Sequence, residues 1–149
     1  MRPWAFSHAD EVRFADLDTL AHLNNVAFLV FVETARVTYV RAATPSGESP
    51  LPPGVGFVIA EQRINYRSPA YLGDRIDTFL RPDDLGRTSF GIEFEMRVGE
   101  RVIADGGVTM VCWDRATERP TPLPDALRER FAADGARERT APPSRLTKL

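Results

Sequence analysis

The stretch from Ser89 to Val98 has the most regular pattern of apolar and polar positions in the chain. Every second residue is apolar, and charged side chains occupy most of the positions between them. This period of two predicts a strand with one face in the core. Short turn-forming joins separate three other strand-like segments, which favours an antiparallel meander. These segments are residues 57–67, 75–81 and 102–113, and Gly106-Gly107 in the last one indicates a bulge or a close backbone approach.

A different pattern runs from Val26 to Ala42, where apolar residues continue without a Gly or Pro to interrupt them. Several of these residues are β-branched, so propensity alone would allow a strand. The run is nevertheless too long for a typical strand and ordinary for a helix, and its polar residues Thr34, Thr38 and Arg41 recur at helical spacing. The sequence therefore predicts one long helix, so apolar that other structure must surround it.

The remaining segments complete an α+β pattern. Residues 11–18 alternate like a short strand, 44–56 form a loop rich in Pro, Gly and Ser, and 124–133 resemble a short helix that begins with Pro. One strand, a long helix and four antiparallel strands are most simply packed as a five-stranded antiparallel sheet wrapped around that helix. Residues 135–149 are polar, basic and Pro-containing, so we expect one domain over residues 1–134 followed by a flexible tail.

Composition narrows the classes of protein. The net charge of −2 argues against a nucleic-acid platform, and no apolar run is long enough to span a membrane or form a signal peptide. The single Cys112 cannot form an internal disulfide, which favours a reducing cytoplasm. With two histidines, one cysteine and no Gly-rich phosphate loop, the sequence predicts neither a metal site nor a cofactor.

Polar side chains gather immediately before the predicted helix, at Asp18, His22, Asn24 and Asn25. A helix start has backbone N–H groups without intrahelical partners and partial positive charge, which suits a polarised carbonyl oxygen. A carboxylate beside it could attack or activate water, although an Asp in such a loop can equally cap a turn. His22 is either a base, a partner that orients Asp18 or an ordinary loop histidine, and the two asparagines are also candidate helix caps.

This stretch resembles a known family. The pattern D-x-D-x-x-x-H-x-N-N from Asp16 to Asn25, followed by E-x-A-R on the helix, is similar to the signature of hotdog-fold acyl-CoA thioesterases of the 4-hydroxybenzoyl-CoA thioesterase branch. The similarity continues through residues 64–74, 86–90 and 119–128. Two departures are Ala21, where the family usually has Gly, and Phe28, where Tyr is common.

The resemblance implies a hotdog fold and hydrolysis of an acyl-CoA to a free acid and CoA. Asp18 would be the nucleophile or the general base, with His22 near it. Backbone and side-chain groups of Asn24, Asn25 and Val26 would contact the substrate. Homodimers or homotetramers with sites at subunit interfaces are also implied. Independently, Arg67 lies near a strand end, where it could meet CoA phosphates.

Two other functions are compatible with the sequence: a non-catalytic acyl-CoA-binding hotdog domain, and a hotdog hydratase or dehydratase. The thioesterase pattern is present, whereas a hydratase His–Asp pair is not recognisable. The sequence leaves the acyl group open among aromatic, short aliphatic and long aliphatic classes.

Overall fold

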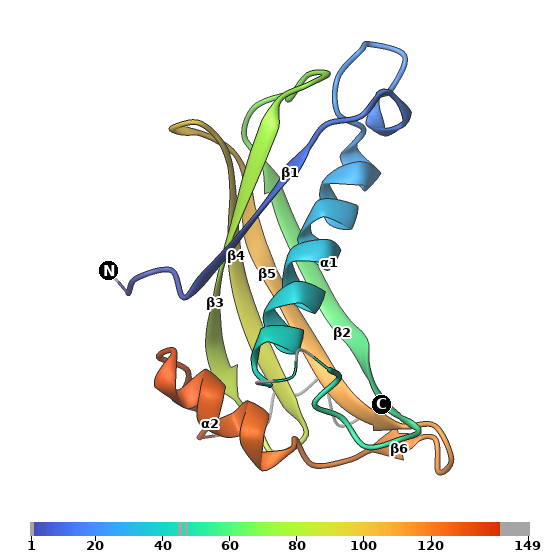
Figure 1. Ribbon diagram of the computed structural model, residues 1–149, viewed down its shortest axis with the longest axis vertical. Helices are drawn as coiled ribbons and strands as arrows, with labels where there is room; N and C mark the ends of the chain where they lie inside the picture. Colours follow the sequence, from blue (N-terminus) through green and yellow to red (C-terminus); the bar gives the residue numbers. More distant parts are fainter. Residues whose placement is uncertain (1, 45, 47, 141–149) are drawn as a thin grey trace.

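In a computed structural model, which describes residues 2–44, 46 and 48–140, one antiparallel sheet curves around one long helix (Figure 1). The strand order is β1-β3-β4-β5-β2, and each neighbouring pair along this path is antiparallel. The main elements are β1 (Phe6–Glu11), α1 (Asn25–Ala42), β2 (Val55–Tyr66), β3 (Arg75–Leu85), β4 (Ser89–Val98), β5 (Arg101–Asp114) and α2 (Asp125–Ala133). Two-residue strands β6 (Arg119–Pro120) and β7 (Arg137–Glu138) pair with β5 and β3. The predicted five-stranded sheet around a helix is therefore confirmed.

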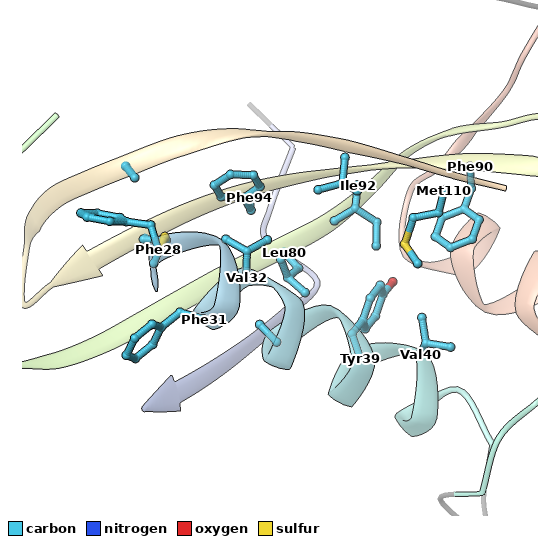
Figure 2. Close-up of a cluster of buried hydrophobic side chains, with 14 of the residues drawn as sticks. Phe28, Phe31, Val32, Tyr39, Val40, Leu80, Phe90, Ile92, Phe94 and Met110 are labelled. Atoms are coloured by element: carbon cyan, nitrogen blue, oxygen red, sulfur yellow. The ribbon is translucent and has the colours of Figure 1, made fainter. Parts of the chain in front are cut away.

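The core lies between α1 and the concave face of the sheet (Figure 2). Phe28, Val32, Ala35 and Tyr39 recur at helical spacing and are almost fully buried. They meet the apolar face of the alternating strand β4, which includes the fully buried Phe94. Burial of each large apolar side chain contributes about 1.5–3 kcal/mol, so the long helix is held mainly by this packing. Among the described residues, neither helix combines the length and apolarity needed to cross a membrane.

The first strand differs from the prediction. The strand is β1, whereas the predicted segment at residues 11–18 turns away from the sheet and includes a short 3₁₀ helix over Phe14–Asp16. The Asp16 carboxylate accepts a hydrogen bond from the backbone N–H of Arg13 at 2.9 Å. Such local side-chain bonds compete with strand pairing, which explains why the strand predicted at residues 11–18 does not form there.

The glycine pair in β5 marks a close approach of two backbones. This was one of the two alternatives predicted for Gly106-Gly107, the other being a bulge. A Cβ atom on Gly106 would lie 1.9 Å from the backbone oxygen of Arg63 on β2. The two strands can approach at this point only because Gly106 has no side chain.

The chain after α2 returns to the sheet. Arg137 and Glu138 lie along β3, and the backbone N–H of Arg139 donates to the Leu85 oxygen at 2.6 Å. The Arg139 side chain also donates to Ser89 Oγ at 2.7 Å. Part of the segment expected to be a flexible tail is thus held in the fold, and residues 141–149 lie outside the described residues.

Candidate active site

The candidate site lies at the start of α1, where the loop after β1 and the β2–β3 connection meet (Figure 1). The loop folds back on itself: the Asn24 N–H donates to the Asp16 backbone oxygen at 2.8 Å, and the Asp18 N–H donates to the His22 oxygen at 2.9 Å. The Leu23 N–H donates to the Ala70 oxygen at 2.8 Å, which ties the loop to the β2–β3 connection. Sequence-distant segments therefore hold the loop in one conformation.

The Asp16 carboxylate supports the fold of this loop. The Asp16 side chain is 8% exposed and receives two hydrogen bonds from the Arg13 guanidinium, at 3.2 and 3.0 Å, besides the backbone bond. Hydrogen bonding from Arg13 holds the pKa of the Asp16 carboxyl below its ordinary value, with burial as the main opposing effect. Both of its carboxylate oxygens are engaged, so Asp16 is not available to react.

Asp18 is the half-buried carboxylate of this loop. Its Oδ1 accepts the backbone N–H groups of Leu20 at 2.8 Å and His22 at 3.2 Å. Among the described residues, none donates a hydrogen bond to Oδ2. The turn-capping role considered from sequence is therefore present, and it fixes the carboxylate while leaving one oxygen free for chemistry.

Ala21 stands where the family usually has Gly, and its backbone conformation shows why glycine is common there. Its φ is +59°, in the left-handed region that glycine adopts at little cost. The backbone of the loop thus requires the conformation that the family's usual glycine favours, and this chain adopts it with alanine.

Asn24 is the N-cap of α1, as predicted, and its side-chain oxygen accepts the N–H of Val26 at 2.9 Å. The Val26 N–H, a predicted substrate contact, is therefore already bonded to Asn24 in this structure. Among the described residues, no acceptor binds the backbone N–H groups of Asn25 and Ala27. These two donors are the ones available to a carbonyl oxygen at the helix start.

Tyr66 is a residue that the sequence analysis did not single out. Its hydroxyl donates to the backbone oxygen of Asn25 at 2.9 Å, and its ring packs edge-on against Phe28 with centroids 5.1 Å apart. The last residue of β2 thus holds the first turn of α1. Only its place inside the similar segment at residues 64–74 could have indicated this from sequence.

The His22 ring contacts Tyr71 rather than the Asp18 carboxylate. The two rings are edge to face with centroids 5.4 Å apart, and in the described part of the chain His22 bonds to the Asp18 side chain through its backbone N–H alone. Large apolar side chains are exposed on this loop, the helix start and the β2–β3 connection, so this end of the molecule is apolar around its polar centre. They are Phe14, Leu20, Val26, Tyr66, Tyr71 and Leu72.

Arg67 is already paired. Its guanidinium binds the Asp105 carboxylate at 3.0 and 3.2 Å, and Asn65 donates to the same carboxylate. These hydrogen bonds, first those of Arg67, hold the pKa of Asp105 below its usual range. A phosphate would have to compete with Asp105 for this side chain.

Within residues 2–44, 46 and 48–140, no three side chains of the His, Cys, Asp and Glu types are grouped so that they could hold a metal ion.

Comparison with known proteins decides the family. The family model described as the thioesterase-like superfamily matches residues 12–131, which include the loop, α1 and every strand of the sheet except β1 and β7. The chain belongs to the thioesterase-like superfamily. This assignment confirms the hotdog fold and places the protein in a family of thioester hydrolases, as the resemblance at residues 16–36 predicted.

Individual relatives agree with this family. The chain is 32% identical over 124 residues to the long-chain acyl-CoA thioesterase FadM of Escherichia coli. The matched region covers 81% of this chain and 92% of FadM. It is 26% identical to the 1,4-dihydroxy-2-naphthoyl-CoA hydrolase of Prochlorococcus marinus, over 83% and 87% of the two chains. A Thermus thermophilus thioesterase crystallised with coenzyme A and Zn superposes with a TM-score of 0.75 and 35% identity, over 89% and 96%.

Proposed function

We propose that the protein hydrolyses an acyl-CoA thioester to a free acid and CoA at the start of α1. One observation carries this proposal: a carboxylate and unoccupied backbone donors lie at the same end of the fold. The Asp18 carboxylate is held in place and has one free oxygen, and the donors are the N–H groups of Asn25 and Ala27. Relatives of similar length are an acyl-CoA thioesterase and a naphthoyl-CoA hydrolase, which supports acyl-CoA as the substrate class.

In the proposed reaction the thioester carbonyl oxygen binds the free N–H groups of Asn25 and Ala27. The positive end of the helix and these donors stabilise the negative charge that develops on this oxygen. Asp18 either attacks the carbonyl carbon through Oδ2 or removes a proton from an attacking water. The C–S bond then breaks, and CoA leaves as a thiolate, which is a good leaving group and needs no strong acid. If Asp18 is the nucleophile, water then hydrolyses the mixed anhydride formed on Asp18, which releases the acid and restores the carboxylate.

His22 and Arg67 have secondary roles in this proposal. The His22 backbone N–H holds Asp18, and its ring stands with Tyr71 at the site's edge, where it can contact the substrate. Arg67 would exchange Asp105 for a CoA phosphate, because phosphate offers the same bidentate geometry with more charge.

Release of free thiol from a panel of acyl-CoAs tests the activity, with long aliphatic, short aliphatic and hydroxyaromatic acyl groups. Asp18→Asn should lower kcat/KM by about 10²–10⁴-fold, the range expected when a positioned base is lost. The matched control is Asp114→Asn, because Asp114 also accepts a backbone N–H in a turn, from Ala116 at 2.9 Å. Near wild-type turnover by Asp18→Asn would refute the mechanism.

A non-catalytic acyl-CoA-binding domain is the second candidate, because the Asp18 carboxylate is engaged as an ordinary turn carboxylate would be. A protein that binds acyl-CoA in calorimetry and releases no thiol from any member of the panel would have this function. A change in enoyl-CoA absorbance without thiol release would indicate the hydratase instead.

We further propose that two copies associate through β2 and α1. Within the described part of the chain, β2 is an edge strand that pairs with β5 alone. Beside it, α1 exposes an apolar stripe of Val26, Val30 and Val37, which are 63%, 50% and 46% exposed. An unpaired edge next to an apolar helix face favours self-association, and pairing β2 with its copy would cover both.

Light scattering at micromolar concentration should give the mass of two chains, or of four if the dimers pair again as a homotetramer. Val30→Glu should shift the mass towards one chain, because it buries a charge in the proposed interface. Ala126→Glu is the matched control, since Ala126 is an exposed apolar position on α2 away from β2. A wild-type monomer at this concentration would contradict the proposed association.

A further inference from the structure

Arg36 is an arginine held inside the protein. It lies on the buried face of α1 and is 8% exposed. One terminal nitrogen donates to Glu33 Oε2 at 3.4 Å, and the other donates to the sulfur of Met110, a weak acceptor, at 3.8 Å. Its Nε is buried and has no hydrogen-bond partner among the described residues. A guanidinium has five N–H donors and stays charged at neutral pH, so this one lacks acceptors.

The same side chain lines a cavity of about 250 Å³ between the second half of α1, the start of β2, β5 and residues 49–51. Apolar side chains form most of its wall, including Val40, Leu51, Phe57 and Met110. Figure 2 shows Val40 and Met110 at this end of the helix, away from Phe28 at its start. A cavity of about 150 Å³ can bind benzene, so this one is large enough for a compact organic group.

The charges at the cavity have one sign. Arg36 and Arg41 both line it, and no acidic side chain among the described residues does. The carboxylate that pairs with Arg36 is that of Glu33, whose side chain is 66% exposed and binds one terminal nitrogen of the guanidinium. Burial lowers the pKa of Arg36, with Glu33 opposing the effect, which reflects an incompletely compensated charge.

We propose that this cavity binds a compact apolar group that carries a carboxylate, with the Arg36 guanidinium paired to the carboxylate. The apolar wall would bury the body of the ligand, and the carboxylate would supply the acceptors that Arg36 lacks. This ligand is either the far end of an acyl group or a free carboxylic acid.

The first source rests on the proposed function and the proposed dimer. Tyr66 at the end of β2 contacts the start of α1, whereas Phe57 near the start of β2 shares the cavity with Val40, so the two elements are antiparallel. A two-fold axis through the middle of β2 therefore brings this cavity beside the partner's helix start. Within one chain, Arg36 is about 16 Å along the helix from Asn25. An acyl group at the partner's site would be much closer to the cavity.

Binding is tested by nuclear magnetic resonance titration of the full chain with benzoate and hexanoate, each beside its neutral amide, benzamide or hexanamide. The carboxylates should bind at least about tenfold more tightly than the amides and should shift the amide signals of Val40, Leu51 and Phe57. Equal affinities, or shifts confined to other residues, would overturn the proposal.

Variants separate recognition by Arg36 from general charge. Arg36→Met should reduce carboxylate affinity to that of the amide, Arg36→Lys should keep part of the preference, and Arg87→Met on an exposed turn should keep all of it. If Arg36→Met does not fold, Leu51→Trp fills the cavity from the loop and should abolish binding of both ligand types. Wild-type affinities in Leu51→Trp would overturn the proposal.

Hydrolysis identifies the source of the ligand. A six-carbon acyl-CoA that ends in a carboxylate is compared with hexanoyl-CoA by kcat/KM. A wild-type preference for the first that falls at least about tenfold in Arg36→Met assigns the cavity to the acyl group. No preference, with carboxylate binding intact, assigns it to free carboxylic acids. Carboxylate binding without any thiol release would refute the proposed function and leave this site standing.

Discussion

The two ends of α1 differ in how completely their polar groups are paired. At its end, the Tyr39 hydroxyl and the Arg130 Nε both donate to Asp134 Oδ2, at 2.6 and 2.7 Å, and Arg130 also donates to the Ala42 oxygen at 3.2 Å. Burial, with the Asp134 hydrogen bond second, raises the pKa of Tyr39 far above its ordinary value. At its start, N–H groups of Asn25 and Ala27 have no acceptor among the described residues.

Apolar packing differs in the same way. α2 covers the end of the helix with the fully buried Phe131, whose ring lies 4.6 Å from that of Phe90. The start is surrounded by exposed apolar side chains such as Leu20 and Tyr71. A region that binds a ligand must leave donors and apolar surface uncovered. The contacts with α2 at the end of the helix therefore stabilise the fold, whereas the start of the helix is open for the proposed reaction.

Phe131→Ala gives the largest expected change in stability. It removes a fully buried ring that also packs 5.7 Å from Tyr39, and should lower the free energy of unfolding by about 3–5 kcal/mol. Urea denaturation measures this loss, and thiol release at 25 °C should show unchanged kcat and KM. A similar fall in kcat would mean that the two ends of α1 are not separate.

Asp16→Asn should have a smaller, pH-dependent effect at the open end. The pKa of Asp16 is below 3.8 in the folded protein, so its stabilising contribution is present above that pH and is lost as the pH falls through the folded-state pKa. The difference in unfolding free energy between wild type and variant should therefore shrink below about pH 4. Because Arg13 is exposed, solvent screens the pair, and a loss as large as that of Phe131→Ala would contradict the comparison.

Ala21→Gly should give the smallest change, in the opposite direction. Glycine relieves the left-handed conformation at φ +59° but gains more freedom in the unfolded chain, so the net gain should be at most about 1 kcal/mol. Thermal unfolding measures it, and Ala126→Gly on α2, where the backbone is helical, should instead destabilise. Destabilisation by Ala21→Gly would show that the loop is not strained.

Predictions from sequence succeeded where the pattern was long. The alternation over β4 and the unbroken run of α1 contain enough periods to exclude other structures, and both were predicted to within a residue or two. The strand predicted at residues 11–18 failed because a short alternating pattern cannot compete with one local hydrogen bond, from Arg13 N–H to Asp16. The fixed segment at residues 137–139 was missed because strand pairing with β3 and the Arg139 contact to Ser89 are long-range.

The candidate site divides in the same way. Asp18, His22 and Asn24 could be named from the sequence because they lie within a few residues of one another and before a recognisable helix. Tyr66 could not, because its contact with Asn25 joins positions 41 residues apart.

The sequence by itself determined the class of the fold, the helix cap and the group of polar residues at the helix start, because each depends on local periodicity or close spacing. Only the tertiary structure decided which donors there are free, since the Asn24 side chain takes the Val26 N–H and leaves those of Asn25 and Ala27. It also decided that Arg36, which the sequence places three residues after Glu33 on the helix, is a buried charge at a cavity. Burial and unpaired donors are properties of packing between distant segments, and no local pattern encodes them.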